Sequence, residues 1–213
     1  RDEQLFMEKE LPKSALFFQE DFFYSYRDDN GNWSRRFALE GDINTDGNEG
    51  AQSLSADGNM MFFTACGRSD GRGSCDIYFS RKTGSGWSAP VNLGMPLNTP
   101  YWESQPSFSS DGKTLYFVSN RPGGRGDKDI WMATIEKYNP EGIPIFGSPV
   151  NLGSNINTTG EENSPFIHHD NKTLYFSSDG HGGMGEQDIF FSRRNSDGEW
   201  QMPVNVGYPI NTQ

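Results

Sequence analysis

Residues 90–99 read Pro-Val-Asn-Leu-Gly-Met-Pro-Leu-Asn-Thr. The phrase returns as Pro-Val-Asn-Leu-Gly-Ser-Asn-Ile-Asn-Thr at residues 149–158 and as Pro-Val-Asn-Val-Gly-Tyr-Pro-Ile-Asn-Thr at residues 203–212, and a weaker copy ends in Ile43-Asn44-Thr45. The last asparagines of the four copies, Asn44, Asn98, Asn157 and Asn211, are 54, 59 and 54 residues apart. Similarity at a nearly constant period indicates repeated structural units that stack on one another.

Each unit opens with the signals of a tight β-hairpin. In the unit that begins near residue 103, a mixed polar and apolar stretch (103–109) is followed by Asp111-Gly112 and by the apolar run 115–118. Asp-Gly accepts the positive φ angles of a two-residue turn, so we predict two antiparallel strands joined there. The same order recurs with first stretches at 49–55 and 162–168, turns at Asp57-Gly58 and Asp170-Asn171, and apolar runs at 60–63 and 174–176.

Two further strands are predicted in each unit. A Gly-rich loop, such as residues 121–126, leads to an Asp-Ile pair that begins the third strand. A variable turn with an aromatic residue then precedes the Pro-Val-Asn phrase, which we interpret as the outer fourth strand and the crossing to the next unit. The third strands begin at Asp76, Asp129 and Asp188, and the aromatic positions are Trp33, Trp87, Phe146 and Trp200.

Four short antiparallel strands per unit, repeated around an axis, describe the blades of a β-propeller. A β-sandwich would not repeat a sentence of side chains in this way. We therefore predict an all-β protein, a β-propeller of four-stranded antiparallel blades with about four blades present, the first one incomplete. The predicted blades are residues 1–46 (partial), 47–100, 101–159 and 160–213, as an excerpt of a larger propeller or an irregularly closed ring.

The first unit lacks the opening stretch of the others. Residues 5–7, Leu-Phe-Met, match the second strand of a blade, and residues 21–24, Asp-Phe-Phe-Tyr, match the third.

Composition narrows the class of protein. The formal net charge is −11 and the pI is near 4.7, which argues against nucleic acid because a phosphate-binding face needs clustered lysine and arginine. No apolar run approaches the roughly 20 residues of a membrane-spanning helix. With 14% aromatic residues and 25 glycines, the sequence favours short strands joined by turns.

The two cysteines, Cys66 and Cys75, flank a Gly-rich turn and could meet across a hairpin. A zinc site needs about four ligands, and no second cysteine pair or nearby histidine offers them. A disulfide would imply an oxidising compartment such as the periplasm. The sequence leaves a disulfide and a pair of free thiols as alternatives.

Residues 106–121, continuing to Asp129-Ile130-Trp131, resemble the WD-like propeller repeat of the TolB type. With the Gly-Gly-x-Gly loop and the Asn-Leu-Gly…Asn-Thr phrase, they resemble repeats of large envelope proteins of the Bacteroidota. Members of that group often carry an outer-membrane-protein-A-like, peptidoglycan-binding domain, absent from this sequence, and some belong to the type IX secretion and gliding apparatus. The resemblance implies a non-enzymatic, periplasmic and outer-membrane-associated scaffold that binds protein partners, with a peptidoglycan link only through domains outside this chain.

Carboxylates recur at fixed places in the unit. Glu49, Glu103 and Glu162 are expected near one mouth of the channel, where a structural role at the start of the strand is favoured over acid–base catalysis because their surroundings repeat. Asp76, Asp129 and Asp188 are expected to accept N–H groups from their own Gly-rich loops. Too few carboxylates lie in one loop for calcium, and we predict no metal and no cofactor. We interpret the histidines as exposed loop residues: His168, His169 and His181.

Binding candidates are exposed aromatic and arginine residues in loops, because such side chains dominate interface energies. They are Tyr101, Trp102, Arg121 and Arg125, with packing between blades as the alternative for Trp102. We predict no catalytic residue. The competing hypothesis is a glycan-binding or carbohydrate-active propeller that uses aromatics and carboxylates at the channel mouth.

Overall fold

The computed structural model describes residues 20–213, except residues 40 and 85, and these form four antiparallel sheets. The strand predicted at residues 5–7 lies outside the described residues. The first sheet, blade one, has only two strands, β1 (Phe23–Tyr24) and β2 (Phe37–Ala38). The all-β class, the antiparallel blades and the incomplete first blade are therefore as predicted.

The other three sheets share one plan, in which each strand pairs with the next along the chain. Blade two contains β3 (Asn48–Leu54), β4 (Met60–Cys66), β5 (Cys75–Thr83), β6 (Gly86–Trp87) and β7 (Val91–Asn92). Blade three contains β8 (Glu103–Phe108), β9 (Thr114–Ser119), β10 (Asp129–Tyr138), β11 (Pro144–Phe146) and β12 (Val150–Asn151). Blade four contains β13 (Glu162–Ile167), β14 (Thr173–Ser178), β15 (Asp188–Arg193) and β16 (Val204–Asn205).

The first hairpin of each blade turns at a residue with positive φ. The angles are 69° at Gly58, 71° at Gly112 and 56° at Asn171, and the N–H of each donates to the carbonyl three residues earlier. Glycine adopts this conformation without strain, and asparagine tolerates it better than most other residues.

The third strand is longer than the sequence indicates in two blades. The far ends of β5 and β10 pair with β6 and β11, which contain the aromatic residues Trp87 and Phe146. These residues were expected in a connecting turn, but they extend the sheet to five strands. The Pro-Val-Asn phrase, in contrast, contributes only two residues to each sheet.

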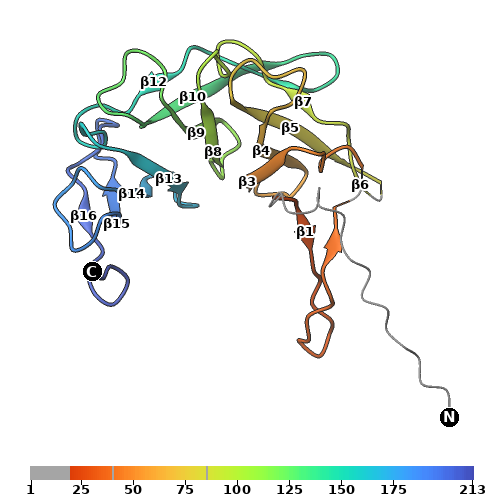
Figure 1. The fold of residues 1–213 in the computed structure, drawn as a ribbon, viewed down its shortest axis with the longest axis horizontal. Coiled ribbons are helices and arrows are strands. Elements are labelled where there is room, and N and C mark those ends of the chain that lie inside the picture. Colours follow the sequence, from red (N-terminus) through yellow and green to blue (C-terminus); the bar gives the residue numbers. More distant parts are fainter. Residues whose placement is uncertain (1–19, 40, 85) are drawn as a thin grey trace, which may run out of the picture.

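The sheets follow one another along an arc, with β3, β8 and β13 on its inner side and the later strands of each blade farther out (Figure 1). Apolar side chains fill the space between neighbouring blades. Ile77 and Leu97 of blade two pack in one cluster with Leu115 and Phe117 of blade three, and all four are fully buried. Burial of apolar surface therefore holds the blades side by side.

One face of blade four differs from its counterparts. Ile130 and Ile156 of blade three are fully buried against blade four, but the corresponding Ile189 and Ile210 are 40% and 64% exposed. No sheet of the described residues packs on this face, so blade four presents an apolar surface where blades two and three present an interface.

Candidate functional site

The three repeated glutamates lie at the start of β3, β8 and β13, and each is at most 1% exposed. Glu103 Oε2 accepts the Thr99 N–H at 2.7 Å, and its Oε1 accepts the hydroxyls of Thr99 at 2.6 Å and Ser119 at 2.7 Å. Glu162 has the same set of donors from Thr158 and Ser178. The glutamates thus fasten each crossing loop to the inner strand that follows it, and their carboxylates are closed to a surface partner.

An arginine completes this arrangement in two blades. Arg121 Nη2 lies 3.3 Å from Glu103 Oε1 and also donates to the carbonyl of Leu97. Arg68 makes the corresponding contacts with Glu49, at 3.1 Å, and with the carbonyl of Ile43. Burial lowers the pKa of Arg121, although Glu103 opposes this shift. Arg121, a binding candidate in the sequence, is therefore tied inside the blade.

His181 takes the place of this arginine in blade four. Its Nε2 donates to the Ile156 carbonyl at 2.9 Å, and its ring lies 5.2 Å from the ring of Phe190. The interpretation of His181 as an exposed loop residue is wrong, because the side chain is half-buried between two blades. Aligning the units on Glu103 and Glu162 would have placed it opposite Arg121.

The three repeated aspartates lie beneath the Gly-rich loops. Asp76 Oδ2 accepts the Arg72 N–H at 2.7 Å, and Asp129 Oδ1 accepts the Gly126 N–H at 3.1 Å. Asp188 accepts the N–H of Met184. Each carboxylate comes so close to a loop glycine that a β-carbon there would collide with it: Gly71, Gly124 and Gly183. Each loop contains a glycine at this place because the aspartate needs the space.

The cysteines form a disulfide between facing positions of β4 and β5, Cys66 and Cys75. This confirms the disulfide alternative and excludes the pair of free thiols. The hairpin register brings the two residues together at the edge of the Gly-rich loop.

The other binding candidates differ in access. Tyr101 is 45% exposed, and Arg125 is exposed on the Gly-rich loop of blade three. Trp102 is half-buried, packs against the cluster between blades three and four, and has Lys128 Nζ 5.4 Å above its ring. Tyr101 and Arg125 therefore remain open to a partner, whereas Trp102 also contributes to packing.

The inner strands contain a feature that the sequence analysis missed. Ala51, Gln105 and Ser164 all have positive φ, between 51° and 56°, and mark a bulge in β3, β8 and β13. Side chains of the preceding blade satisfy two of the freed amides: Gln105 N–H donates to Thr64 Oγ1 at 3.1 Å, and Ser164 N–H donates to Gln105 Oε1 at 2.6 Å. A bulge redirects the side chains that follow it.

Those redirected side chains line a groove across three blades, which we call the inner-strand groove. It is formed by residues 52–54, 106–108 and 165–167 and has a volume of about 400 Å³. Leu54 and Phe166 are 49% and 57% exposed, and Phe108 is buried. The lining contains no charged side chain, and the hydroxyls of Ser53 and Ser107 already accept backbone N–H groups of the next blade.

No protein-family model matches this sequence, and no curated protein matches it. Among solved structures, TolB from Acinetobacter baumannii superposes with a TM-score of 0.51 at 13% identity, covering 84% of this chain and 37% of TolB. The fold is that of a TolB-like β-propeller. An α-L-arabinofuranosidase from Lactobacillus brevis superposes with a TM-score of 0.50 at 15% identity, covering 83% of this chain and 60% of the enzyme.

A puromycin-hydrolyzing peptidase from Mycobacterium tuberculosis has a TM-score of 0.48 at 16% identity, covering 81% of this chain and 26% of the peptidase. This chain thus spans less than two thirds of each of these proteins. At these identities the likeness is one of fold. No helix among the described residues is long and apolar enough to cross a membrane.

These comparisons correct one expectation. The resemblance to envelope scaffolds led us to expect a non-enzymatic protein, but a glycosidase has the same kind of fold. The expectation is wrong as an inference from fold, because one propeller architecture supports binding proteins and enzymes alike.

Proposed function

We propose that this chain is a protein-binding platform of a bacterial cell envelope, and that an extended, uncharged and apolar segment of a partner protein occupies the inner-strand groove. The observation that carries the proposal is the lining of this groove. Two exposed apolar side chains, Leu54 and Phe166, stand on rigid strands over the buried ring of Phe108. Exposed apolar surface fixed by a rigid scaffold is typical of interaction sites.

The polarity of the groove favours a peptide over a glycan. A sugar polymer needs many free hydrogen-bonding groups, but the two serine hydroxyls of the lining are already engaged and no carboxylate or cation is present. The protein as a whole has a formal charge of −11, so an acidic segment would be repelled. An uncharged apolar segment meets neither obstacle.

Two features support an envelope location. The Cys66–Cys75 disulfide is of a kind that persists in oxidising compartments such as the periplasm. The repeat also resembles those of Bacteroidota envelope proteins, which supports an outer-membrane or peptidoglycan-linked secretion or gliding assembly as the setting. Tyr101 and Arg125 would provide further contacts on the loops of the blades.

Site-specific photo-crosslinking in the native cells tests the proposal. A crosslinking amino acid at position 166 should give a discrete protein adduct, and the same group at Ser196, an exposed residue outside the groove, should not. A synthetic peptide with the crosslinked sequence should bind the purified chain and lose at least about tenfold in affinity against Phe166→Lys. No adduct above the Ser196 control, or binding of glycans that Phe166→Lys abolishes, would contradict the proposal.

A further inference from the structure

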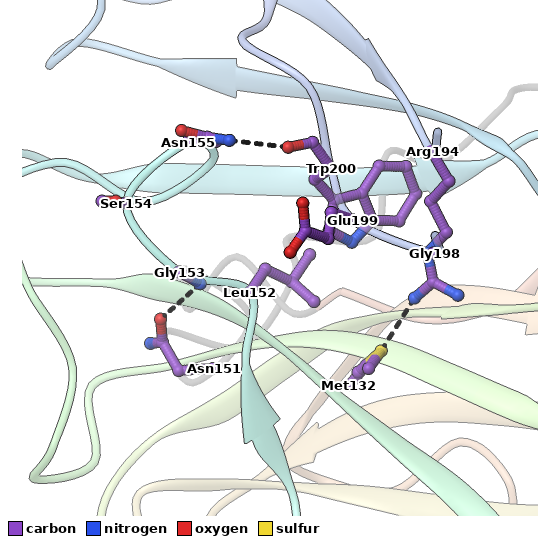
Figure 2. A pocket seen from close by; sticks show the side chains of 10 residues that line it. All are labelled: Met132, Asn151, Leu152, Gly153, Ser154, Asn155, Arg194, Gly198, Glu199 and Trp200. Carbon is purple, nitrogen blue, oxygen red and sulfur yellow. Dashed lines mark hydrogen bonds between the residues drawn. The ribbon is translucent and has the colours of Figure 1, made fainter. Parts of the chain in front are cut away.

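A second hollow lies between blades three and four, where the loop after β12 faces the hairpin after β15 (Figure 2). We call it the Arg194–Trp200 pocket. Its volume is about 340 Å³, which falls within the roughly 300–1,000 Å³ common for small-ligand sites. Its lining includes Met132, Leu152, Asn155, Arg194, Glu199 and Trp200.

Arg194 is poorly satisfied in this pocket. Its guanidinium lies 4.6 Å from the ring of Trp200 and 5.9 Å from the ring of Tyr116. Its Nη2 donates to Met132 Sδ at 3.0 Å, and a thioether sulfur is a weak acceptor. The part of the chain that the structure describes gives Arg194 no ion pair, whereas Arg68 and Arg121 each have a buried glutamate.

Two nitrogens beside the pocket lack an acceptor among the described residues: Nε of Arg194 and Nε1 of Trp200. Trp200 is only 6% exposed, so water does not replace the missing acceptor. A buried unpaired donor costs about 1–3 kcal/mol. Both atoms are covered at present, and a turn of the flexible Arg194 side chain, which gives up only the weak contact to sulfur, would uncover them.

We infer that the Arg194–Trp200 pocket binds the carboxylate of a short aliphatic ligand, such as an acidic side chain or chain terminus of a peptide. A guanidinium receives a carboxylate through two parallel N–H donors, and the Trp200 indole supplies a third. Leu152 and Met132 form an apolar wall for the attached carbons. Glu199 on the rim disfavours a phosphate dianion more than a singly charged carboxylate. The inference is independent of the inner-strand groove.

Nuclear magnetic resonance of the tryptophan indole N–H groups provides the test. Titration with butyrate should shift the Trp200 signal saturably, and the neutral isostere butyramide should not. Trp131 is a matched internal control, because its Nε1 is equally buried and unpaired but lies outside the pocket. Its signal should stay in place.

Variants separate the carboxylate site from nonspecific effects. Arg194→Gln should weaken butyrate at least about tenfold, Arg194→Lys should weaken it less, and Glu199→Gln should strengthen it because a repelling charge is removed. If glucuronate binds more tightly than butyrate, the carboxylate belongs to an acidic sugar, and the peptide source is overturned. No saturable shift of Trp200 with either acid, or a shift that survives Arg194→Gln, would overturn the site.

Discussion

Asn98 binds both backbone groups of Ile77 with one side-chain amide. Its Oδ1 accepts the Ile77 N–H at 2.8 Å, and its Nδ2 donates to the Ile77 carbonyl at 2.9 Å. The amide thereby substitutes for one residue of a neighbouring strand at the point where β7 ends. The same pairing joins Asn157 to Ile130 and Asn211 to Ile189. The last asparagine of the repeated phrase is therefore architectural.

Replacing Asn98 by alanine should destabilise the chain by about 2–4 kcal/mol, because two buried backbone groups of Ile77 lose their partners. Urea denaturation followed by fluorescence measures this. Asn98→Asp is the matched control, since a carboxylate can still accept the Ile77 N–H but cannot donate to its carbonyl. A loss below about 0.5 kcal/mol for the alanine variant would show that the amide does not support the sheet.

Two adjacent glycines test the aspartate and its loop. A β-carbon at Gly183 would collide with the Asp188 carboxylate, whereas one at Gly182 would meet nothing within 4 Å. Gly183→Ala should cost about 2 kcal/mol or more, and Gly182→Ala should stay within about 0.5 kcal/mol of the parent. Thermal melting of the two variants provides the comparison. Equal melting temperatures would mean that Asp188 does not require the space.

Removing the disulfide should lower stability without altering the fold. Cys66 and Cys75 are 9 residues apart, and closing a loop of this length contributes about 2–3 kcal/mol in the chain-entropy model. The double variant Cys66→Ala/Cys75→Ala should therefore unfold at a lower urea concentration with a similar circular dichroism spectrum. Unchanged unfolding midpoints would contradict this contribution.

Acid should weaken the turn that contains Asp170. Burial by itself would raise the pKa of this carboxyl, but hydrogen bonds from the N–H groups of Lys172 and Thr173, at 2.8 Å each, and from the Thr173 hydroxyl lower the pKa below its usual 3.8. A lowered pKa in the folded state adds stability that is present above the unfolded pKa and is lost as the pH falls below it.

Asp170→Asn should consequently reduce the free energy of unfolding at about pH 6 and have a smaller effect at about pH 2.5. Urea titrations at the two pH values measure the difference. A constant difference between parent and variant would argue against a charged Asp170 as its source.

The sequence contains most of the fold because each blade repeats the same local signals. The Asp-Gly turns at Gly58 and Gly112 require positive φ, and the apolar runs in β4 and β9 have no other place than between sheets, so strands and hairpins could be predicted. The site could not. Ala51 and Gln105 are residue types without a signal for positive φ, so the bulges and the groove behind them arise from contacts between blades.

The Arg194–Trp200 pocket was hidden for a related reason. Its walls come from the loop after β12 and the hairpin after β15, and the sequence does not say that these two segments face each other. Trp200 reads as one of the repeated aromatic positions, and Arg194 has no counterpart in the repeat phrases.

Binding of the crosslinked partner peptide to Phe166→Lys, measured together with its melting temperature, tests the central claim most directly. The recurring side chains hold the blades together, and the partner is recognised by the inner-strand groove. Phe166 is 57% exposed, so the variant should melt within about 2 °C of the parent while losing at least about tenfold in affinity. A variant that keeps its melting temperature and its full affinity would contradict the account.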